Sequence, residues 1–317
     1  MSILSTLSRR GIAILACAGF LFAMAGTASA GTIYAIDDQN NLFTFDNAAP
    51  QNITGGAFLT GLKPNEHLIN IDFRPGGAIP GTLYGIGSSY QVYTINAGTG
   101  LCTPVGVGFG PIAGNAFGMD FNPAADRIRL ISDVDTSIRI DPTTGLLAGT
   151  DTPVAYKAGD VNVGKNPNIV GAGYTNSVNP APATTTLYGI DSNTNSLVRI
   201  GGVDGGAPEG SPNAGLLTTI GLLGEDFNNL AGFDISANNV GFASLLVGSN
   251  SSALYGINLA TGATTPFGQI IGGVRVVDIA LEPGVVFNLP EPTSIGLAGL
   301  GVAMLFAVRK RRSRSQA

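Results

Sequence analysis

Apolar and polar residues alternate along most of the middle of this chain. One kind of segment, in which apolar residues alternate around a central position, recurs at residues 69–73, 117–121, 170–174, 233–235 and 277–279. Such period-two alternation predicts β-strands with one buried face. The central residue is an aspartate in four of the five copies, namely Asp72, Asp120, Asp234 and Asp278, and the copy at 170–174 lacks the acid.

Further short apolar segments follow each of these strands. Second strands are predicted at residues 82–86, 127–131, 186–190 and 242–247, and third strands at residues 92–96, 138–141, 197–200 and 254–258. Three third strands end in an Asn/Asp-x-x-Thr-Gly turn, at residues 96–100, 141–145 and 258–262. The Asn or Asp side chain opens such a turn, and its glycine adopts the left-handed conformation that closes a hairpin. Short fourth strands are predicted near residues 104–106, 219–221 and 266–268.

Four antiparallel strands repeated about every 40–50 residues are typical of a β-propeller. The first unit begins at its second strand, residues 32–36 followed by 42–46, and has no leading strand. A strand of the missing kind stands at the far end, at residues 276–281. We therefore predict an all-β propeller of about five blades, in which the C-terminal strand completes the N-terminal blade and leaves no free edges there. A sandwich or an open solenoid is the alternative.

Both ends of the chain resemble addressing segments rather than parts of this domain. Arg9 and Arg10 precede an apolar stretch at residues 12–25, and Ala28-Ser29-Ala30 has the small-x-small pattern of a signal-peptide cleavage site. We predict export with cleavage after Ala30. The expected organisation is a signal peptide at 1–30, a propeller domain at 31–289 and a C-terminal tail at 290–317.

The tail combines Pro290-Glu291-Pro292, an apolar run at residues 295–308 and a basic cluster at 309–312. We predict a short transmembrane segment at 295–308, although it falls below the roughly 20 residues of a comfortable membrane span, and the basic cluster favours a cytoplasmic end. This order resembles the PEP-CTERM sorting signal of Gram-negative bacteria that make exopolysaccharide. The resemblance implies that an exosortase-type membrane protease cuts near Pro290, Glu291 and Pro292, so that a transiently membrane-anchored protein becomes cell-surface or extracellular. An ordinary tail anchor is the alternative.

The repeats also carry a family resemblance. Leu-Tyr-Gly-Ile at 83–86, Thr-Ile-Asn-x-x-Thr-Gly at 94–100 and the segment 121–129 resemble an uncharacterised bacterial family, a domain of unknown function found in secreted proteins. The likeness spans nearly all of residues 31–283. It implies a fold and export, and it implies no mechanism.

The charge of residues 31–289 argues against two classes of binding partner. They hold nine basic and 20 acidic residues, a net charge of −11. Binding of nucleic acid or of anionic membrane surfaces needs clustered Lys and Arg, so this balance argues against both. Cys17 lies in the predicted signal peptide, which leaves Cys102 without a disulfide partner in the mature chain.

Candidate catalytic and metal-binding residues are few. His67 is the one histidine, and no serine lies in a Gly-x-Ser-x-Gly elbow, so a Ser/His/Asp triad is not expected. One histidine and Cys102 cannot supply a zinc site. The recurrent aspartates resemble the channel carboxylates of five-bladed glycosidases. However, a residue repeated in nearly every blade favours a structural role, in which it accepts backbone N–H bonds or links neighbouring blades.

Calcium is the one cofactor that the sequence leaves open. Oxygen-rich turns occur at residues 37–41, 133–137 and 191–195, and the last resembles the opening of a calcium loop. It has Ser196 where an EF-hand has its glycine and Gly202 where an EF-hand has its final carboxylate, so it fails that pattern. Asx-rich hairpin turns explain all three segments without a metal.

We therefore predict an exported protein with a non-enzymatic structural or binding role in the envelope or the exopolysaccharide matrix. The alternative is a carbohydrate-active hydrolase that uses channel-lining carboxylates. No catalytic, cofactor or metal residues are assigned, and the predicted site residues are those of processing: Ala30, Pro290, Glu291 and Pro292. Ice binding has no support, because no regular Thr-x-Thr ladder is present.

Overall fold

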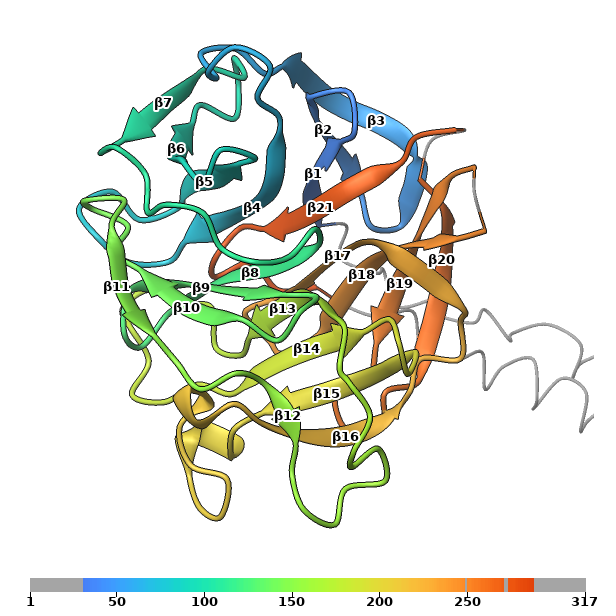
Figure 1. The fold of residues 1–317 in the computed structure, drawn as a ribbon. Helices are drawn as coiled ribbons and strands as arrows, with labels where there is room; N and C mark the ends of the chain where they lie inside the picture. The colour runs from blue at the N-terminus through green and yellow to red at the C-terminus, as the bar shows by residue number, and fades with distance from the viewer. Residues whose placement is uncertain (1–30, 249, 271–272, 288–317) are drawn as a thin grey trace, which may run out of the picture. The chain divides into compact units, whose positions relative to one another are not determined.

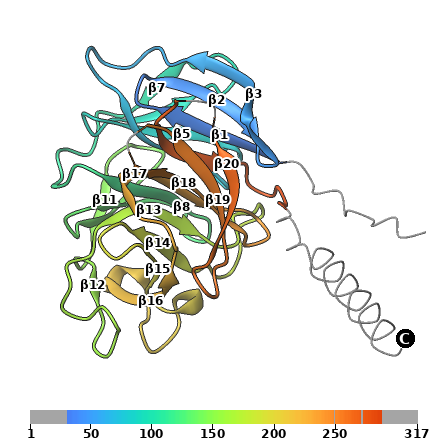
Figure 2. The same cartoon turned by 90° about the vertical axis from the view of Figure 1, so that its right-hand side faces the viewer.

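A computed structural model describes residues 31–248, 250–270 and 273–287. These residues form five sheets, antiparallel except for one two-residue strand, arranged as the blades of a β-propeller and seen from two directions in Figures 1 and 2. The predicted fold class, the number of blades and the closure of the ring are confirmed. The predictions for Ala30, for Pro290, Glu291 and Pro292 and for the apolar run 295–308 lie outside the described residues. Within the described part of the chain, no helix is long and apolar enough to cross a membrane.

The strands of each blade are given in order from the axis outward. Blade 1 contains β21 (Val276–Leu281), β1 (Thr32–Asp37), β2 (Asn41–Asp46) and β3 (Ala49–Phe58). Blade 2 contains β4 (Leu68–Arg74), β5 (Thr82–Gly87), β6 (Val92–Ile95) and β7 (Cys102–Val105). Blade 3 contains β8 (Phe117–Asn122), β9 (Arg127–Ser132), β10 (Ser137–Ile140) and β11 (Leu147–Thr150).

The remaining two blades complete the ring. Blade 4 contains β13 (Ile169–Tyr174), β14 (Leu187–Asp191), β15 (Ser196–Ile200), β16 (Leu216–Leu222) and β12 (Ala155–Tyr156). Blade 5 contains β17 (Phe227–Ile235), β18 (Gly241–Val247), β19 (Ser252–Ile257) and β20 (Thr264–Gln269). Short 3₁₀ turns occur in blade 4 at Val203–Gly205 and Pro212–Ala214.

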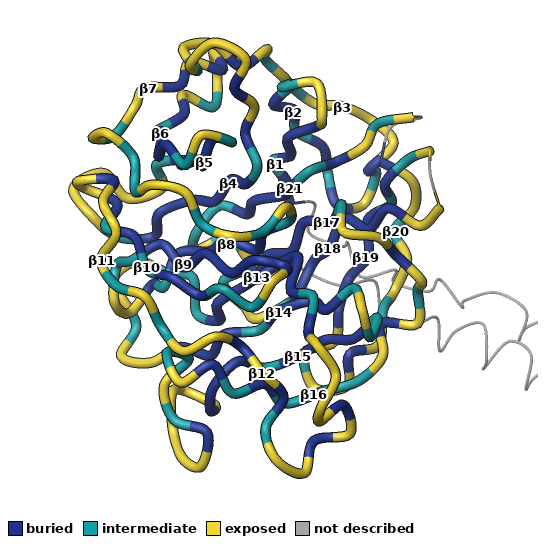
Figure 3. The backbone as a smooth tube through the Cα atoms, viewed as in Figure 1, coloured by how far each residue is buried: buried dark blue, intermediate teal, exposed yellow. Residues whose placement is uncertain are grey.

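The C-terminal strand closes the ring as predicted. β21 pairs antiparallel with β1, with Ala35 opposite Ile279 and Ile33 opposite Leu281. The inner strands β21, β4, β8, β13 and β17 therefore surround the axis, where Figure 3 shows mostly buried backbone. The hydrophobic core lies between adjacent blades, because each sheet buries one face against the next; Phe233 and Ile235 of β17, for example, pack with Val170 of β13.

Three strands of the structure, β3, β11 and β12, were not predicted. β12 is a two-residue strand that pairs in parallel with β16, through Ala155 and Leu216, and such a short segment has no periodicity to detect. β11 is mostly exposed, so it lacks the buried alternation that marks a strand in the sequence. β3 was not predicted either; most of its ten residues are exposed, including Ile53 and Phe58, so it also lacks a buried alternation.

The glycines of the three Asn/Asp-x-x-Thr-Gly turns have the predicted left-handed conformation. Gly100, Gly145 and Gly262 have φ values of 71°, 68° and 76°. Each also lies against a backbone carbonyl of the preceding blade, and a Cβ on Gly262 would stand 2.6 Å from the carbonyl oxygen of Gly221. The turns therefore need glycine both for their conformation and for docking one blade on another.

Both ends of the described domain lie on one face of the ring. The Phe287 amide donates to Asn238 Oδ1 (3.0 Å) in the turn after β17, and the Gly284 amide donates to the Ser177 carbonyl (3.0 Å) in the turn after β13. Gly31 packs against Phe287. These turns follow the C-terminal ends of inner strands, so the chain enters and leaves opposite the face at which the inner strands begin.

Candidate functional site

The four recurrent aspartates bridge neighbouring blades. In each, one carboxylate oxygen accepts a hydrogen bond from a backbone N–H of the next inner strand: Asp278 from Ile71 (3.1 Å), Asp72 from Phe121 (2.7 Å), Asp120 from Tyr174 (3.1 Å) and Asp234 from Leu281 (2.6 Å). In Asp72, Asp234 and Asp278 the other oxygen accepts the N–H of the following residue. The structure thus confirms the interpretation that these aspartates accept backbone bonds and link blades.

The seam between blades 4 and 5 has no such bridge. Gly173 occupies the position that the other inner strands give to aspartate. A Cβ at Gly173 would stand 2.9 Å from Ile235 Cγ1 and 3.1 Å from Phe233 Cε1, so apolar side chains of β17 fill the space of a carboxylate. At the two ends of this seam, amide side chains make the contacts instead: Asn168 donates to Asn229 (2.8 Å) and Asn239 donates to Asn176 (3.1 Å).

Burial sets the protonation of the four aspartates. Loss of water raises the pKa of Asp234 to about 7 and that of Asp278 to about 8. Burial, together with repulsion by neighbouring aspartates, also raises the pKa values of Asp72 and Asp120 well above their usual range. No ion pair in the described part of the chain includes any of the four. The backbone bonds favour ionisation but do not outweigh burial.

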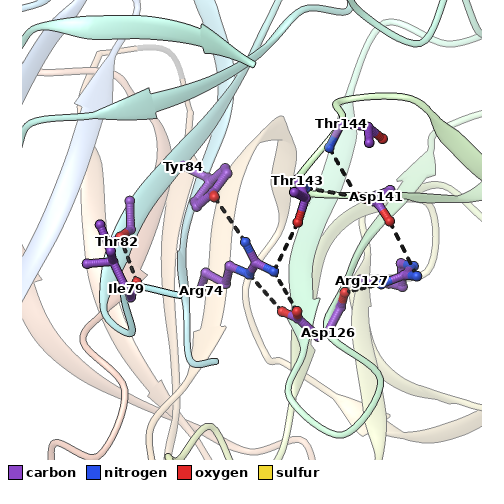
Figure 4. A network of polar contacts seen from close by, with 9 residues as sticks. All are labelled: Arg74, Ile79, Thr82, Tyr84, Asp126, Arg127, Asp141, Thr143 and Thr144. Carbon is purple, nitrogen blue, oxygen red and sulfur yellow. Dashed lines mark hydrogen bonds and ion pairs between the residues drawn. The ribbon is translucent and has the colours of Figure 1, made fainter. Parts of the chain in front are cut away.

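A second polar network joins blades 2 and 3 away from the axis (Figure 4). Arg74 of β4 donates to both carboxylate oxygens of Asp126, at 2.8 and 2.5 Å, and to the Tyr84 hydroxyl at 3.2 Å. The hydrogen bond to Asp126 raises the pKa of Arg74, which stays charged. A depression of about 380 Å³ lies beside Arg74, lined also by Ala78 and Ile79. Because Asp126 neutralises Arg74, this depression offers no free charge.

The strongest candidate for a binding site is a depression of about 290 Å³ where the inner strands begin, which we call the channel mouth. Its apolar floor comes from the starts of β4, β8, β17 and β21: Ile69, Ala116, Phe117, Leu230, Ala231 and Val277. Its polar rim contains Asp38, His67, Asn115 and Asn229. An adjoining shallower hollow shares Asn115 and Asn229 and adds Asn228 and Arg275. Blades 1, 2, 3 and 5 thus contribute to one site.

Hydrogen bonds fix the rim at several points. The backbone N–H of Asn115 donates to Asp133 Oδ1 (2.9 Å), and Asn229 Oδ1 accepts from Asn168 Nδ2 and from Ser192 Oγ, both at 2.8 Å. Arg275 Nε lies 3.6 Å from Asp38 Oδ2. The rim is therefore largely preformed, as binding sites for small ligands usually are.

The mouth rests on the inner strands below it. Asn70 Nδ2 donates to the Phe117 carbonyl (2.9 Å) and to Asp278 Oδ2 (3.0 Å). Asn70 therefore connects the floor of the mouth to one of the bridging aspartates. Its Oδ1 atom is buried and has no hydrogen-bond partner within the described residues.

Tyr90 supports one wall of the mouth in an unusual backbone conformation. Its φ is 63°, a left-handed value uncommon for a bulky residue. Residues with the same conformation in the corresponding turns of blades 1, 3 and 4 are Asn40, Asp135 and Asn195. The Tyr90 ring packs edge-on against Phe109 and Phe117, and its hydroxyl donates to the Ile112 carbonyl (3.1 Å). Tyr90 thus holds the 106–116 loop that carries the wall of the mouth.

The sequence singled out few of these residues. His67, expected in a polar loop before a strand, lies exposed on the rim of the mouth. Asp38, Asn115, Asn229 and Arg275 were missed as a group, because they are far apart in the sequence. The available signal was that Asn115, Asn229 and Arg275 each lie near the start of an inner strand.

Two of the three oxygen-rich turns, at residues 37–41 and 191–195, act as Asx turns, whereas in the turn at 133–137 the Ser132 hydroxyl oxygen accepts the amides of Val134 (3.3 Å) and Thr136 (3.2 Å). Asp37 Oδ1 accepts the amides of Gln39 (2.9 Å) and Asn41 (2.8 Å), and Asp191 Oδ1 accepts that of Asn193 (2.8 Å). Across the described residues, no group of three or more His, Cys, Asp or Glu side chains is placed to hold a metal ion.

Comparisons with known proteins place the domain in a family. The model of DUF4394, a domain of unknown function, matches residues 41–280. No curated protein matches the chain. A crystal structure of a Lactobacillus plantarum protein is similar at 17% identity, with a TM-score of 0.38, over 78% of this chain and 70% of that one. The Dos1 propeller is similar at 11% identity, also with a TM-score of 0.38, over 72% of this chain and 54% of its own.

Proposed function

The chain belongs to the DUF4394 family, and from the geometry of the channel mouth we propose that the protein is an exported binding module. It binds a component of the cell envelope or of the exopolysaccharide matrix and catalyses no reaction. The observation that carries the proposal is the mouth itself, where four blades place an apolar floor inside a fixed polar rim. Convergent polar groups around an apolar concavity are the usual form of a ligand site.

Export and sorting are part of the proposal. The support is the signal-peptide pattern that ends at Ala30 and the Pro290-Glu291-Pro292 tail, which resembles an exosortase substrate. The described domain begins at Gly31 and ends at Phe287 on the face opposite the mouth.

The hydrolase alternative has less support. Glycosidases of the usual kind need two carboxyl groups about 5–9 Å apart that reach the substrate. Asp72, Asp120, Asp234 and Asp278 are buried and bonded to backbone N–H groups. Among the described residues that line the mouth, Asp38 is the single carboxylate, whereas such hydrolysis needs two. We therefore propose binding without turnover.

Retention on immobilised exopolysaccharide from the producing cells tests this proposal. We expect the purified protein to be retained and to release no new reducing ends. Ala116→Trp fills the mouth and should reduce retention at least tenfold, whereas Ala78→Trp fills the depression beside Arg74 and should leave retention unchanged. Release of oligosaccharides, or equal retention of the two variants, would contradict the proposal.

Mass spectrometry of the secreted fraction tests export separately. We expect a mature N-terminus at Gly31 and a C-terminus near Pro290, Glu291 and Pro292. Deletion of those three residues should leave the protein in the membrane fraction. An intact tail on secreted protein would show that the tail is not a sorting signal.

A further inference from the structure

The rim of the mouth presents a hydrogen-bond donor whose orientation is determined by its neighbours. Asn229 Oδ1 already accepts two bonds, from Asn168 Nδ2 and from Ser192 Oγ. Its Nδ2 group has no hydrogen-bond partner among the described residues, and Asn229 is exposed on the rim. Asn229 therefore offers two N–H donors to a ligand.

Acceptors and further donors stand on other blades. The Asp38 carboxylate accepts one weak bond, from Gln39 Nε2 (3.3 Å), and lies near Arg275 at 3.6 Å. Asp38 thus retains acceptor capacity, and the side-chain amide of Asn115 supplies both kinds of group. A ligand at the mouth meets donors and acceptors around its edge and apolar side chains such as Ile69 and Leu230 beneath it.

This arrangement matches a sugar ring, which has hydroxyl groups around its edge and C–H groups on its faces. Each sugar hydroxyl can both donate and accept a hydrogen bond. It can therefore accept from the side-chain amides of Asn115 and Asn229 and donate to the carboxylate of Asp38. The C–H face can cover the apolar floor and remove it from water.

Charge restricts which sugars fit. Residues 31–289 have a net charge of −11, and Arg275, the basic residue of the adjoining hollow, already has Asp38 beside it. An anionic sugar would approach an acidic domain without a free cation to receive it. A cationic sugar would compete with Arg275 for Asp38. An uncharged sugar meets neither obstacle.

Shape restricts how the sugar enters. Strand starts from four blades surround the mouth, and its volume of about 290 Å³ is at the lower end of ligand pockets. A pit of this size accepts one terminal unit rather than the middle of a polymer.

We propose that the mouth binds the uncharged terminal sugar of a polysaccharide chain. This inference rests on the proposed binding function and names its ligand class. Titration calorimetry tests it with the purified full-length protein and four probe series, each of three to six sugars: β-1,4-glucan, α-1,4-glucan, oligogalacturonate and glucosamine oligomers. We expect a neutral series to bind most tightly, with less than a twofold change in affinity from three to six sugars.

Two amide variants provide the control. Asn229→Ala removes the donor at the mouth and should weaken binding at least tenfold. Asn239→Ala removes the matching amide contact with Asn176 at the far end of the same seam and should change affinity less than twofold. Asn229→Asp retains the acceptor atom but loses the donors, so it should resemble Asn229→Ala.

The outcomes separate this inference from the function on which it rests. Tightest binding of galacturonate or glucosamine oligomers, with loss in Asn229→Ala, would overturn the uncharged class and leave binding at the mouth intact. A more than tenfold gain in affinity with chain length would overturn recognition of the terminal unit. No binding of any series would overturn the inference, whereas retention on native exopolysaccharide decides the proposed function independently.

Discussion

Four seams of the ring are bridged by an aspartate, and the seam between blades 4 and 5 is not. At the bridged seams a buried carboxylate accepts a backbone N–H of the next blade, as Asp72 does from Phe121. At the remaining seam Gly173 faces Phe233 and Ile235 of β17, and the backbone N–H of Ile235 donates to Asp234 Oδ1 (2.5 Å) within its own strand. The ring therefore closes in two chemically different ways.

The difference shows what the aspartates do. Inner strands have one unpaired edge, and buried N–H groups on that edge need acceptors. An aspartate supplies an acceptor from the neighbouring blade, at the cost of burying a carboxyl group without a basic partner. Where β17 has other partners, apolar packing joins the blades without this cost. Aspartates thus satisfy the strand edge and fix the fit between blades, and they do not add stability through ion pairing.

Exchanging the two kinds of seam should have the largest effect. Gly173→Asp restores the repeat pattern in the sequence but places a carboxyl against Ile235 and Phe233. We expect a loss of about 3 kcal/mol or more in the free energy of unfolding, through overpacking and burial of an unpaired polar group. Urea unfolding measures it, and Gly98→Asp in an exposed turn should stay within about 0.5 kcal/mol. Equal stability of the two variants would show that the seams are interchangeable.

Removing a bridge should have an intermediate effect. Asp72→Ala leaves the N–H groups of Phe73 and Phe121 without their acceptor. Each unsatisfied buried group costs about 1–3 kcal/mol, so the free energy of unfolding at pH 5 should fall by an amount of that order. The exposed carboxylate of Asp226 provides the control, since Asp226→Ala should change stability by less than about 0.5 kcal/mol. No difference between the two variants would remove the bridging role.

The bridged seams should also make stability depend on pH. An aspartate in the unfolded chain has a pKa of about 3.9, whereas the folded pKa is about 7 for Asp234 and about 8 for Asp278. The folded protein then holds protons that the unfolded chain has released. The contribution of these two carboxyl groups to the free energy of unfolding should be greatest below about pH 4. It should fall as pH rises to about 8, by up to about 1.4 kcal/mol per pH unit for each carboxyl.

Asp278→Asn tests this dependence because it removes one titrating group and keeps an acceptor. Its unfolding free energy should fall less steeply between pH 5 and pH 8 than that of the unmodified protein, while Asp226→Asn should leave the slope unchanged. A slope that is the same in all three proteins would show that Asp278 does not hold its proton in this range.

The amide contacts at the ends of the glycine seam should matter least for stability. Asn239→Ala removes exposed contacts with Asn176, so we expect a change of about 0.5 kcal/mol in the free energy of unfolding. A loss above about 2 kcal/mol would show that these amides, rather than Phe233 and Ile235, hold blades 4 and 5 together.

Much of the fold could be predicted because its information is local. Alternating residues define strands, Gly100 and its equivalents mark turns, and the missing first strand reappears at 276–281. The role of the recurrent aspartates was also predicted, since repetition itself favours structure over catalysis. β12 could not be predicted, because its two residues are positioned by pairing with β16 rather than by their own pattern.

The mouth was less predictable for a physical reason. Asp38, Asn115 and Asn229 come from three blades and meet because the ring closes, so no local spacing relates them. The contact of Tyr90 with the 106–116 loop likewise depends on how the chain folds back on itself. Tertiary closure, rather than strand propensity, creates the site.

Closure by β21 is the central claim, since two of the bridges, Asp278 to Ile71 and Asp234 to Leu281, depend on where this strand lies. The most direct measurement is oxidative cross-linking of Ala35→Cys combined with Ile279→Cys, located by mass spectrometry, because these residues are opposite each other in β1 and β21. The account predicts an intrachain disulfide in the folded protein and none in the control pair Ala35→Cys with Ala172→Cys. A failure of the first pair to cross-link, or equal cross-linking of both pairs, would contradict it.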